Sequence, residues 1–182
     1  MHPTKYLVAA AALVLAPMAQ GFELVSNDIQ AGKLMPKTQE YQGFGCDGGN
    51  VSPQLAWRDV PAGTKGFAIT AYDPDAPTGS GWWHWIAYNI PANVHMLPSN
   101  VGDPTSGLSP EGMVQHRTDF GTPGFGGACP PKGDKAHRYQ FKVFALDVAH
   151  LDIAPESSAA LVGFMLNAHK LGVAELEALY KR

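Results

Sequence analysis

The sequence predicts a single, mainly β domain with long loops, and three observations support this prediction. Short apolar runs rich in β-branched and aromatic residues recur along the chain, as is typical of strands. Glycine and proline, with 20 and 15 residues, make up nearly a fifth of the 182 residues and indicate many turns. Helical spacing of apolar residues is confined to the C-terminal part. We therefore expect an antiparallel β architecture with functional loops.

Three runs are expected to be the main strands. Gly66–Tyr72 is short and apolar, and it ends at an Asp-Pro turn. His84–Ile90 is a second run, which a proline stops. Tyr139–Val148 first alternates apolar and polar residues and is then apolar on both faces. Shorter strands are expected near Phe22–Val25 and Gln54–Trp57.

Helix is expected only near the C-terminus. Pro155 suits the first helical position, because its missing N–H would have no partner there. Apolar residues then recur at helical spacing as far as Ala168, and Lys170 with Gly172 marks the end. A last short helix is expected over Ala174–Lys181.

The first 21 residues have the pattern of a secretory signal. Lys5 gives a positive start, Tyr6–Met18 is apolar, and Ala19–Gly21 places small residues where a signal peptidase reads them. The apolar run is shorter than the roughly 20 residues that span a bilayer, so a transmembrane anchor is not expected. A buried N-terminal helix is the structural alternative. We expect cleavage after Gly21 and a periplasmic or secreted domain of residues 22–182.

The charge of this mature domain excludes some partners. Without residues 1–21 it holds 12 basic and 16 acidic residues, a formal charge of about −4, because that segment contains one lysine and no acid. A mildly acidic chain without a basic block is not expected to bind nucleic acid. About 160 residues suffice for one domain with a proper core, and no linker or repeat divides them.

The two cysteines, Cys46 and Cys129, both lie in glycine-rich loops. Export would place them in an oxidising compartment, where an even pair favours a disulfide. We expect a Cys46–Cys129 disulfide that ties the first glycine-rich loop to the second. Two free, half-buried thiols are the alternative.

Two loops carry most of the functional information. Asp73–Pro77 runs on to Trp82–Trp85, and Gly127–Gly133 runs on to His137–Tyr139. Each loop delivers a histidine beside aromatic residues at the start of an expected strand. Together they supply carboxylates, imidazoles, rigid turns and glycine N–H groups that can form an anion-binding nest, which are the parts of a small polar pocket.

Structural roles for the same side chains stay open. An Asp beside a proline often only caps a turn through its own side chain, which is the alternative for Asp73 and Asp75. A lone histidine is usually a satisfied surface or core residue. Arg138 points away from the face that His137 and Tyr139 share, and we expect it to be a structural ion-pair or hydrogen-bond donor.

The two loops, in this order and spacing, resemble the phosphatidylethanolamine-binding protein family, also called Raf kinase inhibitor-like proteins, and in particular its bacterial YbhB/YbcL-type branch. The resemblance runs from about Phe22 to Arg182. It includes Tyr41–Pro53 (YQGFGCDGGNVSP), Arg117–Gly121 (RTDFG) and Leu171–Tyr180. It implies an antiparallel β-sandwich-type single domain with long loops and short C-terminal helices.

The resemblance also implies a small ligand pocket, of a kind that accepts phosphate-like anions and phospholipid headgroups. The implied lining residues are Asp73, His84, Trp83 or Trp82, Cys129, Pro131, His137 and Tyr139. Three features depart from the animal pattern. Trp83 stands where a second histidine is often found, Cys129 stands where glycine is common, and the closing segment lacks the animal type's terminal helix.

From these features we expect a non-enzymatic, exported protein that binds a phosphate-like or phosphoethanolamine-like headgroup without cofactor or metal. A hydrolase or metalloenzyme built on Asp73, Asp75, His84 and His137 is one rival. The motifs HExxH, GxSxG and CxxC do not occur in the sequence.

The second rival is a protein-interaction modulator that resembles a protease or kinase inhibitor. The expected exposed loop Asn93–Met113 offers a surface for such a partner, although no residue in it identifies one. His95 and His116 in this region are expected to be solvated.

Overall fold

The computed structural model describes residues 21–182, so the predicted signal segment lies, apart from Gly21, outside the described residues. The strands form a five-stranded sheet (β10-β9-β5-β6-β8), a three-stranded sheet (β1-β4-β7) and the β2-β3 hairpin. The elements are β1 (Glu23–Val25), η1 (Lys37–Gln39), β2 (Gln42–Gly43), β3 (Cys46–Asp47), β4 (Leu55–Arg58), β5 (Gly66–Asp73), β6 (Trp82–Pro91), β7 (Met96–Leu97), β8 (Val114–Gln115), β9 (His137–Leu146), α1 (Ala159–His169) and β10 (Lys170–Tyr180). All strand pairs in the sheets are antiparallel, and the predicted mainly β class is confirmed.

The main core lies between the five-stranded and three-stranded sheets. Phe67, Trp85 and Phe141 from the large sheet are buried there with Leu55 and Trp57 from β4. Burial of such large apolar side chains stabilises the fold by roughly 1.5–3 kcal/mol each. The two sheets therefore form the expected sandwich.

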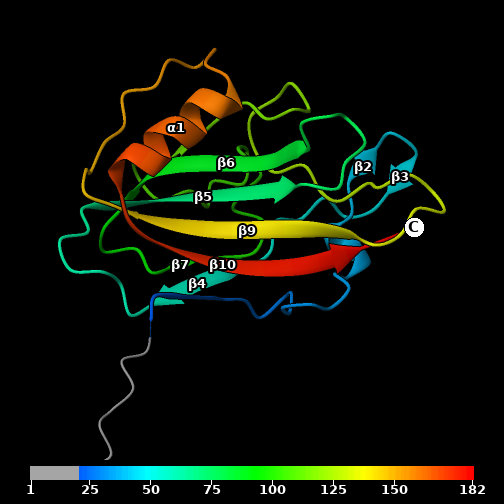
Figure 1. The fold of residues 1–182 in the computed structure, drawn as a ribbon, viewed down its shortest axis with the longest axis horizontal. Helices are drawn as coiled ribbons and strands as arrows, with labels where there is room; N and C mark the ends of the chain where they lie inside the picture. The colour runs from blue at the N-terminus through cyan, green and yellow to red at the C-terminus, as the bar shows by residue number, and fades with distance from the viewer. Residues whose placement is uncertain (1–20) are drawn as a thin grey trace, which may run out of the picture.

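A second, smaller core covers the outer face of the large sheet. Helix α1 lies across this face in Figure 1, and its Val162 and Leu166 pack with Ile86 and Phe144 of the sheet. Both faces of β5, β6 and β9 are thus covered, which explains why their sequences are apolar over long runs. Strands β5, β6, β9, β1 and β4 match the five predicted strands within two residues at each end.

Helix α1 begins four residues later than the sequence predicted. The side-chain oxygen of Ser158 accepts a hydrogen bond from the backbone N–H of Leu161 at 3.1 Å and so caps the helix, which starts at Ala159 rather than Pro155. Within residues 21–182, none of the helices has the length and apolar character that crossing a membrane demands.

The predicted helix over Ala174–Lys181 is wrong, because this segment belongs to β10. Every second residue of this segment is buried: Ala174, Leu176, Ala178 and Tyr180. The residues between them, Glu175, Glu177 and Leu179, are less buried. β10 pairs with β9 along its whole length, from Lys170 opposite Leu146 to Tyr180 opposite His137. The alternation of buried residues and this pairing outweigh the helix propensity of Ala, Leu and Glu.

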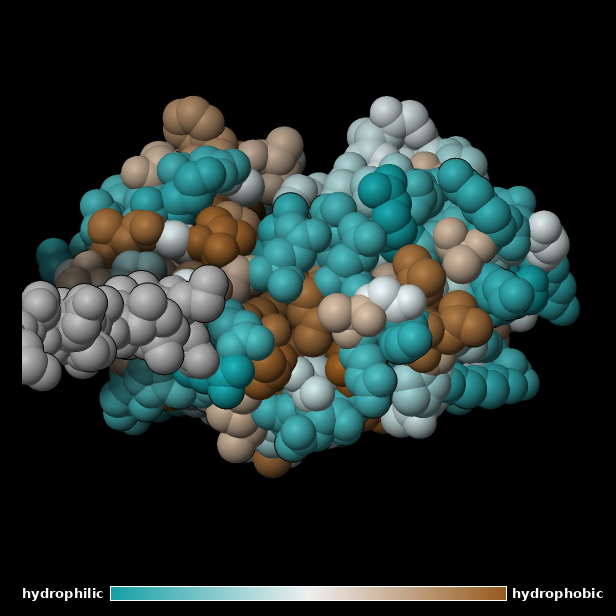
Figure 2. Space-filling view, turned by 60° about the horizontal axis from the view of Figure 1, so that its bottom comes forward, coloured by the Kyte–Doolittle hydropathy of each residue, from teal (hydrophilic) through white to brown (hydrophobic). Residues whose placement is uncertain are grey.

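The region around Asn93–Met113 is only partly an exposed loop. Leu97 and Val101 are fully buried, whereas His95 is exposed as expected. The expectation that His116 is solvated is wrong, because its side chain is buried and its Nε2 lies 2.9 Å from the carbonyl oxygen of Ser157. On the face in Figure 2, hydrophobic residues form small patches between hydrophilic ones.

Strand direction brings the predicted functional loops together. β5 ends at Asp73, whereas its antiparallel neighbours β6 and β9 begin at Trp82 and His137. These three strand termini lie at the same end of the sheet, beside the β2-β3 hairpin and the C-terminus (Figure 1). The fold therefore converts two distant sequence motifs into neighbouring walls.

We predict opposite effects of alanine at two glycines. A Cβ at Gly127 would overlap the backbone of Gln39 and Glu40, so Gly127→Ala should lower the free energy of unfolding by about 1–3 kcal/mol. Gly163 lies in α1, and a Cβ added there would be 4.0 Å from its nearest neighbouring atom, so Gly163→Ala should raise that free energy by up to about 1 kcal/mol. Urea denaturation of both variants measures these changes, and a stable Gly127→Ala variant would contradict the packing described.

Candidate functional site

A cavity of about 170 Å³ opens at the end of the sheet where the two loops meet. Its walls combine buried polar groups with aromatic rings and prolines. They consist of Phe44, Asp73, Ala76, Pro77, Thr78, Trp82, His84, Phe120, Cys129, Pro130, Pro131, His137 and Tyr139. The structure thus brings together the residues that the sequence proposed for a pocket, with the exception of Trp83.

The structure places Trp82, not Trp83, in the wall of the cavity. Trp82 and His84 both line the cavity, whereas Trp83 between them points to the other face of the sheet. A register shift at His84 interrupts the alternation, so that Trp85 lies in the main core although Trp83 does not. Trp83 instead packs on the ring of Tyr72, with centroids 4.7 Å apart, and adjoins the core beneath α1.

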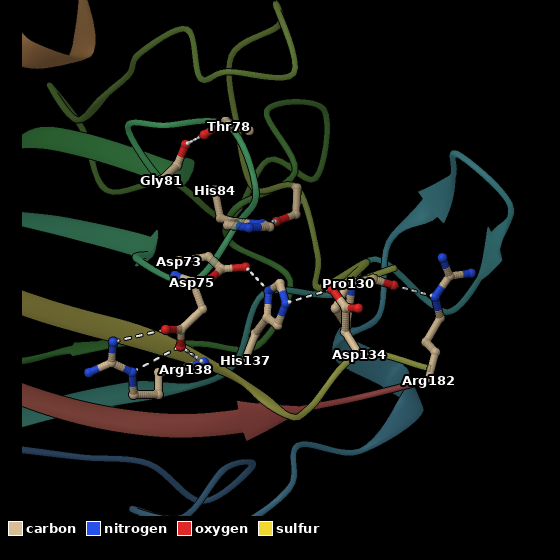
Figure 3. A network of polar contacts seen from close by, with 11 residues as sticks. Asp73, Asp75, Thr78, Gly81, His84, Pro130, Asp134, His137, Arg138 and Arg182 are labelled. Carbon is tan, nitrogen blue, oxygen red and sulfur yellow. Dashed lines mark hydrogen bonds and ion pairs between the residues drawn. The ribbon is translucent and has the colours of Figure 1, made fainter. Parts of the chain in front are cut away.

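A buried hydrogen bond joins the two loops at the floor of the cavity (Figure 3). His137 Nδ1 lies 2.8 Å from Asp73 Oδ2, and both side chains are almost completely buried. The other oxygen of Asp73 accepts the backbone N–H of Asp75 at 2.8 Å. Asp73 therefore caps its turn, which is the structural role considered for it, and also orients an imidazole at the cavity.

The second nitrogen of His137 is turned toward an exposed acid. His137 Nε2 lies 3.6 Å from Asp134 Oδ2, which is on the loop that leads into β9 (Figure 3). Because Asp73 accepts at Nδ1, the proton of the neutral ring resides on that nitrogen. Nε2 is then the nitrogen that can accept a hydrogen bond from a ligand or, when protonated, donate one to a ligand or to Asp134.

His84 is held as a neutral ring. Its Nδ1 donates to the carbonyl oxygen of Gly126 at 2.8 Å, and no other hydrogen bond of this ring is found within residues 21–182. Burial lowers the pKa of His84, although the Gly126 carbonyl and the Asp73 carboxylate oppose this shift. The neutral ring therefore carries its proton on Nδ1 and offers Nε2 as an acceptor.

Two donor groups in the wall have no protein partner in the described part of the chain. The Tyr139 hydroxyl and the Trp82 indole N–H are both buried, and neither makes a hydrogen bond of good geometry. The Tyr139 hydroxyl nevertheless lies near the Asp73 carboxylate and the backbone of Cys129. Burial, together with the Asp73 carboxylate, raises the pKa of Tyr139, so its hydroxyl stays protonated. Buried polar groups without partners are rare, and such groups at a cavity wall are candidates for ligand contacts.

Two of the three glycines of the second loop, Gly126 and Gly127, have N–H groups that are not available to form the predicted anion-binding nest. The N–H of Gly126 donates to the carbonyl oxygen of His84 at 2.8 Å, and the N–H of Gly127 donates to Asn50 Oδ1 at 2.7 Å. The glycines therefore have a packing role instead: because they lack a Cβ atom, the second loop can approach neighbouring backbone and side chains closely.

An ion pair fixes the outer part of the first loop. Arg138 Nε and Nη2 each lie 2.9 Å from an oxygen of Asp75, and the backbone N–H of Arg138 also donates to this carboxylate. The Arg138 guanidinium lowers the pKa of Asp75 to about 2. The structural role expected for Arg138 is confirmed, and Asp75 is the acid that serves purely as a loop anchor. No three His, Cys, Asp or Glu side chains of residues 21–182 gather into a metal-binding group.

A covalent bond and an arginine tie the β2-β3 hairpin to the mouth of the cavity. The expected disulfide joins Cys46 to Cys129, whose Cα atoms are 6.0 Å apart. Arg182 adds hydrogen bonds to the carbonyl oxygens of Pro130 at 2.8 Å and Gly45 at 2.7 Å. Phe44, at the turn of the hairpin, is thereby held beside the cavity.

Sequence reasoning did not assign several wall residues to the pocket. They are Phe44, Ala76, Pro77, Thr78, Phe120 and Pro130. Phe44 and Phe120 lie within the segments YQGFG and RTDFG, which carried the family resemblance. The sequence contained the signal, but no pattern in it indicates that these two rings meet at one cavity.

The fold and site define a class of two-sheet β-sandwich with a small cavity, lined by polar and aromatic side chains, at the ends of its central strands. The chain belongs to the phosphatidylethanolamine-binding protein family, whose sequence profile matches residues 25–181. It is 53% identical over 169 residues to the UPF0098 protein YbcL of Escherichia coli, and the aligned part covers 93% of this chain and 92% of YbcL. It is 51% identical over 160 residues to YbhB of the same organism, covering 87% and 99%.

Solved structures agree with this assignment. The crystal structure of E. coli YbcL, described as a member of the mammalian family, superimposes with a TM-score of 0.87 at 54% identity, covering 90% of this chain and 99% of YbcL. A homologue from Chlamydia trachomatis gives a TM-score of 0.73 at 29% identity, covering 89% and 98%. The predicted β-sandwich-type fold of the family is confirmed.

We predict that the disulfide contributes strongly to stability. Its cysteines are 83 residues apart, and the chain-entropy account gives about 4 kcal/mol for a closed loop of this size. Unfolded, unreduced protein should contain no titratable thiol, and a Cys46→Ser/Cys129→Ser variant should lose about 2–5 kcal/mol in urea denaturation. Two thiols per chain in protein isolated under oxidising conditions would contradict the pairing.

We also predict an acid-range stability contribution from Asp75. Since its folded pKa is about 2 and its ordinary value is 3.8, the contribution is present above about pH 4 and is lost as pH falls toward 2. Asp75→Asn should flatten the dependence of unfolding free energy on pH in that window, with Asp59→Asn as an exposed control. An unchanged slope in Asp75→Asn would show that the ion pair has no net effect.

Proposed function

We propose that this chain is a non-enzymatic binding protein that holds a small phosphate-bearing headgroup, such as phosphate or phosphoethanolamine, in the cavity of Asp73, His84, His137 and Tyr139. The observation that carries the proposal is the pair of unpartnered donors, the Tyr139 hydroxyl and the Trp82 N–H, beside two imidazoles in one small cavity. Phosphate oxygens accept hydrogen bonds from all of these groups once the imidazoles are protonated.

The charge around the cavity favours a headgroup with a cationic part. No lysine or arginine lines the cavity within the described residues, and Arg138 is already paired with Asp75. The carboxylate of Asp134 lies beside His137 Nε2 and is half exposed, so it can receive an ammonium group. A phosphate joined to an ammonium group therefore satisfies both kinds of partner. The name of the family, which refers to phosphatidylethanolamine, agrees with this chemistry.

A binding role agrees better with the wall chemistry than a hydrolytic one. The Asp73–His137 pair resembles the orienting pair of catalytic sites, but covalent catalysis also needs a side-chain nucleophile within reach of such a base. Thr78, the one aliphatic hydroxyl in the wall, donates to the carbonyl oxygen of Gly81, and Cys129 is in the disulfide.

Export to the periplasm or beyond the cell is part of the proposal. The signal-like pattern of residues 1–21 supports it, and so does the disulfide, because structural disulfides persist mainly in oxidising compartments. Fractionation with N-terminal sequencing tests this part: we expect a mature chain that starts near Phe22.

We predict that sulfate, whose charge is constant between about pH 5 and 8, binds more tightly as pH falls. His84 is neutral near pH 7 because burial lowers its pKa, so it must take up a proton before Nε2 can donate to the anion. A bound anion raises that pKa again, and the affinity should increase by up to about tenfold per pH unit for each proton taken up. Asp73, Asp134, His137 and Tyr139 are the other titratable side chains that face or border the same space.

Replacement of the two histidines tests the site directly. His84→Ala and His137→Ala should each weaken sulfate binding by about 1–3 kcal/mol in calorimetry, which is the scale of a charge-assisted hydrogen bond. His169→Ala is the matched control, because this histidine pairs with Asp147 at the end of α1. Unchanged sulfate affinity in both cavity variants, with circular dichroism like that of the unmodified protein, would refute the proposed function.

A further inference from the structure

The mouth of the cavity carries an exposed aromatic ring. Phe44 is 71% exposed, the highest value among the large apolar side chains of the described residues. It stands at the turn between β2 and β3 and lines the cavity. An apolar side chain in water that also borders a binding cavity is a candidate contact for a partner.

This ring is held out by its surroundings. Its backbone has φ = +54°, a left-handed conformation that is unusual and unfavourable for a bulky residue. The Cys46–Cys129 disulfide and the Arg182 bond to Gly45 fix the hairpin on both sides of the turn. Phe44 therefore carries two local costs, an exposed ring and a rare backbone conformation, and such costs concentrate at functional sites.

Further rings continue the apolar surface inward from Phe44. The Phe120 ring lies nearly parallel to Phe44 at a centroid distance of 5.9 Å, and Tyr41 stacks on Phe120 at 4.4 Å. Trp82 meets Phe120 edge-on at 5.4 Å. The cavity is thus polar at its floor and aromatic at its mouth, which matches a molecule with a polar head and an apolar body.

Charge near the mouth favours a phospholipid surface. Lys132 and Lys135 lie exposed on the loop after Pro131, and neither forms an ion pair within residues 21–182. Asp134 lies between them beside His137, so this loop carries one net positive charge. Exposed lysines beside an exposed aromatic ring are the two features that hold a protein at a lipid interface. The cavity itself is small, at about 170 Å³, which suits a headgroup better than acyl chains.

We propose that the Phe44 hairpin inserts into the interface of a phospholipid bilayer, so that the cavity binds the headgroup of a lipid whose acyl chains stay in the membrane. This inference rests on the proposed headgroup function and adds the source of the ligand, a bilayer surface rather than a free phosphate compound. The rigid hairpin supplies the apolar contact, and the lysines supply attraction to anionic lipid.

The test is sedimentation with vesicles of phosphatidylethanolamine and phosphatidylglycerol, using the mature chain. Phe44→Asn removes the ring and suits the left-handed backbone, so the hairpin should keep its shape. Vesicle affinity should fall at least about tenfold, the effect of withdrawing one phenyl group from an apolar environment. Phe164→Asn is the matched control, since Phe164 is 67% exposed on α1 and does not line the cavity; its vesicle affinity should change less than about twofold. Phe44→Trp, which keeps a large aromatic ring at this position, should bind vesicles as the unmodified protein does.

Three outcomes would overturn the inference. One is sulfate binding by the unmodified protein without vesicle binding, which leaves the proposed function intact. Another is an equal loss of vesicle affinity in Phe44→Asn and Phe164→Asn. The third is an equal loss of sulfate and vesicle affinity in Phe44→Asn, which assigns Phe44 to the cavity wall alone. Absence of sulfate binding in the unmodified protein would instead refute the function on which this inference rests.

Discussion

The candidate site depends on the buried hydrogen bond between Asp73 and His137. Neither group tolerates burial alone, because a carboxylate and an imidazole both lose water when the sandwich closes. Each becomes acceptable only through the other, at 2.8 Å, and this requires the end of β5 to lie beside the start of β9. The second oxygen of Asp73 fixes Asp75, which in turn holds Arg138. One buried pair thus sets the positions of the floor and of the first loop.

The polar costs of this end of the molecule are offset by the remainder of the fold. The Tyr139 hydroxyl and the Trp82 N–H have no partner among the described residues, and Phe44 is exposed in a rare conformation. Away from the cavity, two apolar cores cover both faces of the central strands. Two further buried polar atoms without a partner among the described residues, Gln39 Oε1 and Trp57 Nε1, lie away from the cavity. The two at the cavity wall differ from these because a ligand can reach them, which makes them candidates for ligand contacts.

Much of this could be predicted from the sequence, for identifiable reasons. Apolar runs ended by Asp-Pro and Pro indicated the strands near the cavity, and the order of the two loops indicated the family. The segment 174–181 was misjudged because Ala, Leu and Glu favour helix, whereas its fate depends on pairing with β9, which local sequence does not contain. The glycine N–H groups of the second loop looked free for the same reason, since Asn50 and His84, their acceptors, are distant in sequence. His116 was buried by a contact with Ser157 that no local pattern reveals.

The choice between Trp82 and Trp83 shows a finer limit. Alternation along a strand puts one of two adjacent tryptophans on each face, but which face is the cavity depends on the neighbouring sheet and helix. Here α1 covers the side of Trp83, and the cavity receives Trp82 with His84. The sequence predicted that one of the two tryptophans lines the cavity, and the packing of α1 against the sheet determines that it is Trp82.

The central claim is that His84 is neutral in the free protein and donates to an anion through Nε2 in the bound one. Nitrogen NMR of the imidazole rings during a sulfate titration near pH 7 tests this most directly, because it reports the protonation of each ring nitrogen. Nε2 of His84 should change from unprotonated to protonated as sulfate binds, while His169 should be unaffected. Saturable sulfate binding with His84 Nε2 unprotonated throughout would contradict the claim.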